Sequence, residues 1–136
     1  MRQISRKGLI EKLDEVFSKY IRLRDCLAYS GTPELGKCFT CDKETLYSEA
    51  NAGHFISRKS MKIRWSEENV SLQCVYCNKW LRGNYIEYTV RLQRKYSVEV
   101  VDGLIAQKHM IYKHTIQELE ILIDTYADKL LQLSNQ

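Results

Sequence analysis

The sequence predicts an α+β fold in which a short β-β-α centre, organised by four cysteines, is flanked by helices at both ends. Three observations predict it: helical spacing of apolar residues near each terminus, two Cys-x2-Cys pairs in the middle, and short apolar runs between those pairs. The 136 residues, 44% of them hydrophobic, suit one domain with its own core. We divide residues 1–136 into an N-terminal helix (1–35), the cysteine-rich centre (36–83) and C-terminal helices (84–136).

The first helix is expected over residues 3–28. Its apolar positions recur at spacings of three and four, with charged residues on the other face. They are Leu9, Leu13, Val16, Tyr20, Leu23 and Leu27. The run Ser30-Gly31-Thr32-Pro33 should end this helix.

The two cysteine pairs are Cys38-x2-Cys41 and Cys74-x2-Cys77, separated by 32 residues. The N-terminus has no apolar stretch typical of a secretory signal, so we expect a reducing compartment, where disulfides are uncommon. Four thiolates at this spacing predict one tetrahedral structural zinc. Redox dithiols or packed free cysteines are the alternative. Cys26 is expected to be a buried apolar residue.

The centre should contain strands at Ala50–Ile56 and Val70–Gln73, with a basic loop at Ser57–Arg64 between them. A helix is expected at Val75–Arg82, ending at Gly83. Asn84 and Glu87 suggest a capping pair for a helix at Tyr85–Tyr96, and a further helix should span Val98–Lys108. Thr115 and Glu118 form a capping-box pattern before a last helix that reaches about Leu133. Its apolar stripe is Leu119, Leu122, Tyr126, Leu130 and Leu133.

His54, Asn69 and Asn78 follow the order of an HNH (His-Me finger) nuclease site: a histidine at a strand end, an asparagine before the next strand and a polar residue on the following helix. A neutral imidazole can take a proton from an attacking water. Asn69 can fix the loop that carries His54, and Asn78 can offer an amide oxygen to Mg²⁺ or Mn²⁺, which would neutralise charge on the leaving oxygen. In this scheme zinc is structural only.

Gly53 departs from many HNH enzymes, which have an aspartate ligand immediately before the histidine. The catalytic ion would then be held more weakly, or by another oxygen such as that of Glu49 or Glu87. His54 could also be a ligand instead of the base. His109 and His114 are expected at the surface or at helix ends. Trp65 and Trp80 are expected in the core, with stacking platforms for bases as the alternative.

The charge is unevenly distributed. Residues 1–96 hold 18 basic and 11 acidic residues, and residues 97–136 hold three and six, so a basic body precedes an acidic region. Four cations lie in the basic loop and two follow the last cysteine, and we expect them to contact DNA phosphates, although such runs also form plain solvated faces. These six are Arg58, Lys59, Lys62, Arg64, Lys79 and Arg82.

The run AGHFISRKSMKIRWSEENVSLQCVYCNKWLRGNYIEYTVRLQRKY resembles the phage lambda NinG (Rap) recombination protein family, and the likeness extends over about residues 36–125. The site is also similar to endonuclease-VII-type resolvases, in which an asparagine directly after the last zinc cysteine binds the catalytic metal, as Asn78 follows Cys77 here. The resemblance implies a nuclease that cuts branched DNA, such as Holliday junctions or D-loops, during phage recombination. If the chain is phage-encoded, it would act in the cytoplasm of the bacterial host, beside recombination proteins.

The sequence therefore favours a metal-dependent endonuclease that leaves 5′-phosphate and 3′-hydroxyl ends. The alternative is a zinc-containing DNA-binding or architectural module without catalysis, and a helical adaptor is a third reading. No segment is apolar enough to predict a membrane span. A homodimer built on the last or the first helix would match the two equivalent strands of a junction. The alternative is that these two helices pack on each other within one chain.

Overall fold

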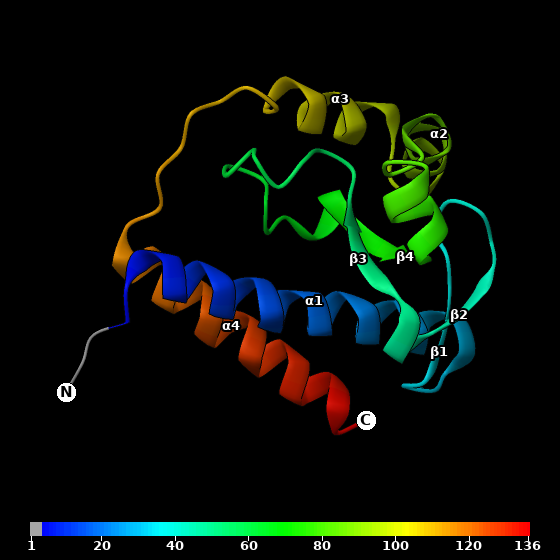
Figure 1. Ribbon diagram of the computed structural model, residues 1–136, viewed down its shortest axis with the longest axis horizontal. Coiled ribbons are helices and arrows are strands. Elements are labelled where there is room, and N and C mark those ends of the chain that lie inside the picture. Colours follow the sequence, from blue (N-terminus) through cyan, green and yellow to red (C-terminus); the bar gives the residue numbers. More distant parts are fainter. Residues whose placement is uncertain (1–3) are drawn as a thin grey trace.

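A computed structural model describes residues 4–136 as a mixed α+β fold with four α-helices and two small antiparallel sheets (Figure 1). The elements in order are α1 (Arg6–Ser30), β1 (Leu35–Lys37), β2 (Glu44–Leu46), β3 (Asn51–His54), β4 (Val70–Gln73), α2 (Tyr85–Lys95), α3 (Val98–Ala106) and α4 (Ile116–Ser134). Short helical turns lie at Tyr47–Glu49, Glu67–Asn69 and Tyr76–Trp80. Among the described helices, none is both long enough and apolar enough to cross a membrane.

Helix α1 begins and ends at ordinary capping residues. The Ser5 hydroxyl accepts from the backbone of Gly8, and Gly31 closes the helix in a left-handed conformation (φ 73°). The helix therefore starts at Arg6, later than the predicted residue 3, which lies outside the described residues, and it continues two residues past the predicted end.

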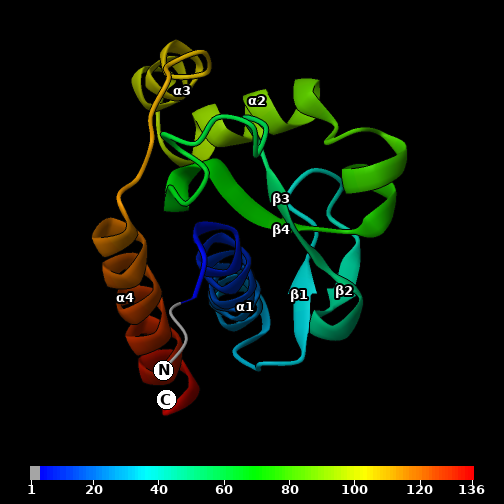
Figure 2. The ribbon, with the colours of Figure 1, turned by 60° about the vertical axis from the view of Figure 1, so that its left-hand side comes forward.

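Helices α1 and α4 pack along each other (Figures 1 and 2). Leu13, Phe17 and Ile21 of α1 share one core with Leu119 and Tyr126 of α4. The predicted capping box at the start of α4 is present, with the side chains of Thr115 and Glu118 each bonded to the other's backbone. The two helices therefore pack on each other within the chain, which is the alternative that the sequence left open, and Leu119 and Tyr126 of the α4 stripe are buried against α1.

Strands of both sheets contact α1. Strand β3 pairs antiparallel with β4, with Gly53 opposite Ser71 and His54 opposite Val70, which confirms the predicted hairpin in shorter form. The β1–β2 hairpin was not predicted. Its turn carries the first cysteine pair, with the Cys38 amide bonded to the Lys43 carbonyl.

The segment after β4 differs from the predicted Val75–Arg82 helix. It forms one wide turn at Tyr76–Trp80, in which the Leu81 amide donates to the Tyr76 carbonyl five residues back. Asn84 occupies the N-cap position before α2 as predicted, but its side chain forms no capping hydrogen bond. That residue is left-handed (φ 51°) and its amide points toward the Thr40 carbonyl and Cys77 sulfur, because the chain turns sharply here to close the cysteine cluster.

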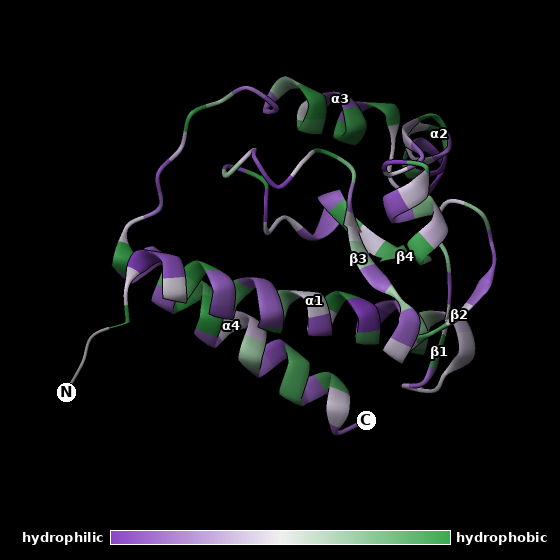
Figure 3. Cartoon of the chain, in the orientation of Figure 1, coloured by the Kyte–Doolittle hydropathy of each residue, from purple (hydrophilic) through white to green (hydrophobic). Residues whose placement is uncertain are grey.

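A second core lies between the hairpin loop and the helices α2 and α3, whose ribbon in Figure 3 carries mostly apolar colours along α3. It contains Phe55, Ile56, Ile63, Tyr88, Leu92, Val101 and Leu104. Two placements were mispredicted. Trp80 is 76% exposed instead of a core residue, and His114 is buried, with its ring against those of Trp65 and Tyr112. Trp65 and Cys26 are buried as expected.

Candidate functional site

The four cysteine sulfurs form one compact cluster. Cys38, Cys41, Cys74 and Cys77 place their Sγ atoms within 4.8 Å of one another, and those of Cys41 and Cys74 are 3.8 Å apart. Four thiolates at Zn–S bonds of about 2.3 Å in a tetrahedron have sulfurs about 3.8 Å apart. The cluster can therefore hold a metal ion such as zinc.

The surroundings of the cluster suit thiolates. The Thr40 hydroxyl lies 3.5 Å from Cys38 Sγ, the Cys77 amide donates to Cys74 Sγ and the Asn84 amide to Cys77 Sγ. Burial raises the pKa of Cys38, but hydrogen bonds from Thr40 and the backbone outweigh it and bring that pKa to about 7. One sulfur is thus readily deprotonated, which is the state that binds metal.

His54 stands at the end of β3 with its imidazole oriented by the backbone. Nε2 lies 2.9 Å from the Arg64 carbonyl oxygen, so Nε2 carries the proton and donates. Among the described residues, no hydrogen bond engages Nδ1. Burial lowers the pKa of His54 to about 4, which keeps the ring neutral at pH 7 with Nδ1 as its free basic atom.

Asn69 is fully buried and fixes the loop after His54. Its Oδ1 accepts from the Ile56 amide, and its Nδ2 donates to the carbonyls of Ile56 and Ile63. The Asn69 carbonyl also accepts from the Phe55 amide. The Asn69 side chain forms no hydrogen bond with the imidazole, so its hydrogen bonds act on His54 by holding the loop that follows it.

His54 and Asn78 line a common pocket of about 620 Å³ between α1, β3 and the turn after β4, which we call the His54 pocket. Four cationic residues line it as well: Arg22, Arg58, Lys79 and Arg82. The only carboxylate in the lining is that of Asp14. The pocket therefore combines a neutral histidine with a strong excess of positive charge, an environment that favours a phosphate group.

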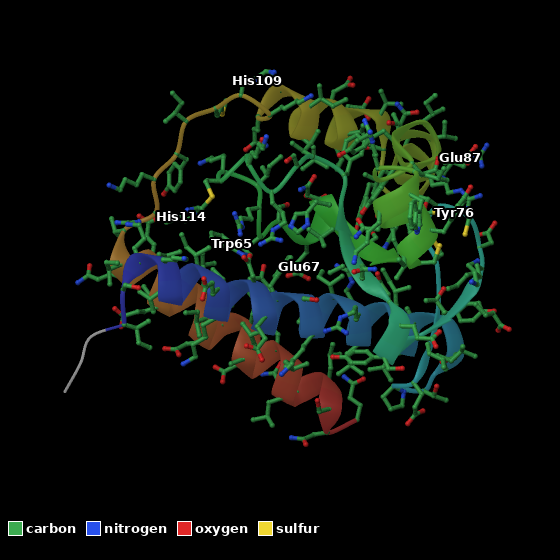
Figure 4. All side chains as sticks on the ribbon, in the orientation of Figure 1. Trp65, Glu67, Tyr76, Glu87, His109 and His114 are labelled. Carbon is green, nitrogen blue, oxygen red and sulfur yellow. The ribbon has the colours of Figure 1, made fainter. Side chains whose placement is uncertain are left out.

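Asp14 is occupied by contacts inside the protein. Its carboxylate accepts from the Arg64 guanidinium, from Arg58 and from Trp65 Nε1. These contacts outweigh burial and lower the pKa of Asp14. Figure 4 shows Trp65 beside α1. Arg64, with 14% of its side chain exposed, is thereby committed to an internal ion pair, whereas Arg58 keeps 59% exposure.

The other predicted cations of the basic loop do not join this pocket. Lys59 borders a separate hollow near His109, and the Lys62 ammonium lies over the Tyr112 ring. Glu49 and Glu87, considered as metal ligands, are also outside the lining, and Glu87 pairs with Arg91. The structure thus brings together His54, Asn78, Arg58, Lys79 and Arg82, but not the remaining loop residues.

The glycine before the histidine is explained by its neighbour Gln73. A Cβ atom added at Gly53 would lie 1.8 Å from Gln73 Oε1. Gln73 Nε2 donates to Thr40 Oγ1 and to the Gly83 carbonyl. A flipped amide would place Gln73 Oε1 against the Gly83 carbonyl oxygen, and both of these oxygens are acceptors. Gln73 Oε1 is buried and has no hydrogen-bond partner among the described residues. An aspartate at position 53 would therefore require the Gln73 side chain to move.

Sequence reasoning missed Arg22, Asp14 and Gln73. The first two have a weak signal: Asp14, Ser18 and Arg22 are spaced by four residues, so they form one polar line on α1, and all three line the pocket. Gln73 is a polar residue at the end of an apolar strand, directly before a cysteine. Only the tertiary contact with Gly53 shows its importance.

The fold and the site define a small α+β protein with a four-cysteine cluster that can hold a metal ion, and with a cationic histidine pocket. A family model described as "Bacteriophage Lambda NinG protein" matches residues 2–136, and the chain belongs to that NinG family. It is 32% identical to protein ninG of Escherichia phage lambda over 99 residues, which is 72% of this chain and 48% of that protein.

Similar values relate the chain to protein ninG of Escherichia phage 933W (31%, over 72% of this chain and 48% of that protein) and of Salmonella phage P22 (30%, over 71% and 47%). The chain thus spans about half the length of the curated relatives it matches. No solved structure matches it.

Proposed function

We propose that this protein is a metal-dependent DNA endonuclease of the HNH type. The observation that carries the proposal is the pairing of a neutral, backbone-oriented His54 with Asn78 in a pocket lined by four cationic residues. Hydrolysis of a phosphodiester needs a base for the water, positive charge around the phosphate and a rigid scaffold. The pocket offers the first two, and the cysteine cluster with Asn69 offers the third.

His54 acts as the general base. The Arg64 carbonyl holds the Nε2 proton, so Nδ1 accepts a proton from a water directed at phosphorus. Arg58, Lys79 and Arg82 neutralise the phosphate, and the bond to the 3′-oxygen breaks, with solvent water supplying the proton of the 3′-hydroxyl. The products carry 5′-phosphate and 3′-hydroxyl ends. Asn69 is a positioning residue in this scheme.

Zinc at the four cysteines would be structural, because four thiolates leave it no open position. For the reaction, Mg²⁺ or Mn²⁺ would supply charge neutralisation at the leaving oxygen. Asn78 would offer the amide oxygen for this ion, and Asn51 is a second amide in the lining of the pocket. Because the Asp14 carboxylate is paired with arginines, most of the other ligands of the catalytic ion would be phosphate oxygens and water.

Branched recombination intermediates, such as Holliday junctions and D-loops, are the proposed substrates, and recombination proteins the proposed partners. Family membership supports a phage origin and hence the cytoplasm of the bacterial host as the place of action. A homodimer on a four-way junction remains part of the proposal, with an interface that does not use Leu119 and Tyr126, which are buried against α1.

A second candidate function is a zinc-containing DNA-binding or architectural recombination module without catalysis. The packing around Gly53 favours this non-catalytic module, since Gln73 occupies the space where many HNH enzymes place a metal-binding aspartate. Such a module would use the same cationic pocket for phosphates but would not cut.

Cleavage of linear, forked and four-way DNA, measured with Mg²⁺, with Mn²⁺ and with EDTA, separates the two candidates. The endonuclease should cut branched DNA in either metal and stop in EDTA. Binding to all three DNAs without a cut under any of these conditions would leave the architectural module.

A further inference from the structure

The turn Tyr76–Trp80, which begins inside the second cysteine pair, exposes aromatic side chains to an unusual degree. Trp80 is 76% exposed and Tyr76 is 60% exposed, whereas Trp65 is 6% exposed. Figure 4 shows Tyr76 on this segment, at the edge of the molecule far from the α1–α4 core. An indole so exposed loses the burial that normally stabilises it, so its position calls for a partner.

The segment is held in place rather than loose. Cys74 and Cys77 anchor it to the cysteine cluster, and the Leu81 and Gly83 amides bond back to the carbonyls of Tyr76 and Cys77. Its side chains are therefore presented on a scaffold that should change little on binding, which lowers the entropic cost of association.

Tyr76 and Trp80 are neighbours in sequence of residues that line the His54 pocket, although they are not in that lining themselves. Lys79 and Arg82, both exposed, alternate with Tyr76 and Trp80 along the chain and line that pocket. Tyr85, 47% exposed, also lines it, and its ring lies over Gly83, where an added Cβ would be 3.2 Å from the ring. Aromatic rings interleaved with cations are the pattern that binds single-stranded nucleic acid, through base stacking and phosphate contact.

We propose that Trp80 and Tyr76, with Tyr85 at the pocket edge, form a stacking site for unpaired nucleobases. This inference rests on the proposed DNA-cleaving function and deepens it, since the site would place a strand with unpaired bases across the His54 pocket. Stacking reads no sequence, so the selected feature is the unpaired state. Lys79 and Arg82 hold the backbone of the same strand.

The test uses the fluorescence of the two tryptophans in the full zinc-loaded chain, titrated in EDTA-free buffer with Ca²⁺ in place of Mg²⁺. The probes are a short oligothymidylate and a blunt hairpin duplex. Oligothymidylate should quench the wild-type emission, and the duplex should quench it much less. Trp80→Phe, which leaves only the buried Trp65, should lose the quenching but keep the affinity measured by fluorescence anisotropy of labelled DNA.

Trp80→Ala should weaken oligothymidylate binding by about 10-fold and leave duplex binding unchanged. Ile86→Ala is the matched control, because Ile86 is an 81% exposed apolar residue of α2 outside the His54 pocket, and it should bind both probes as wild type does. Circular dichroism of each variant shows whether it is folded. Equal loss on both probes, or wild-type quenching that persists in Trp80→Phe, would overturn the stacking site.

The outcome is separable from that of the nuclease proposal. Cleavage of branched DNA with no Trp80 quenching would leave the nuclease and remove the stacking site. Quenching with no cleavage would leave the stacking site and favour the architectural module. Trp80 emission that changes with protein concentration in the absence of DNA would instead assign the surface to a second copy of the chain, against the proposal.

Discussion

At the scale of single residues, the chemistry of the site depends on the hydrogen bonds that orient each side chain as well as on the residue types. His54 has a defined free nitrogen because its other nitrogen is bonded to a backbone carbonyl. All the side-chain hydrogen bonds of Asn69 are formed with the loop beside His54. Position 53 favours glycine because the Gln73 amide fills the space that a side chain would need.

Replacing Gly53 by alanine should destabilise the fold, because the new Cβ meets the Gln73 amide, which hydrogen bonds to Thr40 and Gly83 hold in place. We expect a loss of about 1–3 kcal/mol in the free energy of unfolding, measured by urea denaturation. In a Gln73→Ala background the same change should cost much less. Strictly additive costs in this double-mutant cycle would show that the two side chains do not compete for space.

The buried His54 should make stability depend on pH. Its pKa falls from 6.5 in the unfolded chain to about 4 in the folded one, so the unfolded state binds more protons between these values. The contribution of His54 to the free energy of unfolding should therefore be complete above pH 6.5 and decrease as the pH falls toward 4. His54→Gln should flatten the decline of the total free energy of unfolding without abolishing it, since burial also lowers the pKa of His114. An identical pH profile in the variant would place the linked protons elsewhere.

At the scale of elements, the cysteine cluster joins three short pieces that could not be stable alone: the β1–β2 turn, the end of β4 and the Tyr76–Trp80 turn. Metal binding to such pieces contributes directly to folding. Cys74→Ala, or removal of zinc by a chelator, should unfold this centre and reduce near-ultraviolet circular dichroism.

Cys26→Ala is the control for that experiment, because Cys26 is buried outside the cluster and should cost only a small cavity. Elemental analysis should find about one zinc per chain in the wild type and in Cys26→Ala. A well-folded wild-type protein without metal would contradict the structural role of the cluster.

Some of the helices and strands could be predicted from the sequence, and others could not. The stripes of α1 and α4, the β3–β4 hairpin, the cysteine set and the Thr115 box follow from local patterns, so they could be predicted. The β1–β2 hairpin could not, because three-residue strands carry almost no periodicity. The exposure of Trp80 was also unpredictable, since a tryptophan in an apolar segment is usually buried and only the cysteine anchors turn this one outward.

At the scale of the whole molecule, the basic residues divide into two groups that the sequence could not distinguish. Arg58, Lys79 and Arg82 border the His54 pocket, whereas Lys59 and Lys62 lie toward the Lys108–Tyr112 side. The fold thus assigns different roles to cations that are neighbours in the chain.

This division predicts the salt dependence of DNA binding. The double change Lys79→Ala and Arg82→Ala should lower the slope of log K against log salt on duplex DNA by about 1.8, that is, about 0.9 for each lost phosphate contact. Lys59→Ala with Lys62→Ala removes the same charge and is the matched control, expected to leave the slope nearly unchanged. Equal effects of the two pairs, measured by fluorescence anisotropy over a range of salt, would show that general charge and not the pocket directs binding.

The most direct test of the central claim is the rate at which His54→Ala cleaves branched DNA in Mg²⁺, compared with wild type. A positioned general base contributes about 10²–10⁴-fold, so we predict a loss of that size, with wild-type binding of the same DNA and an unchanged circular dichroism spectrum. Cleavage by His54→Ala at the wild-type rate would contradict the assignment of His54 as the base and, with it, the nuclease site proposed in this pocket.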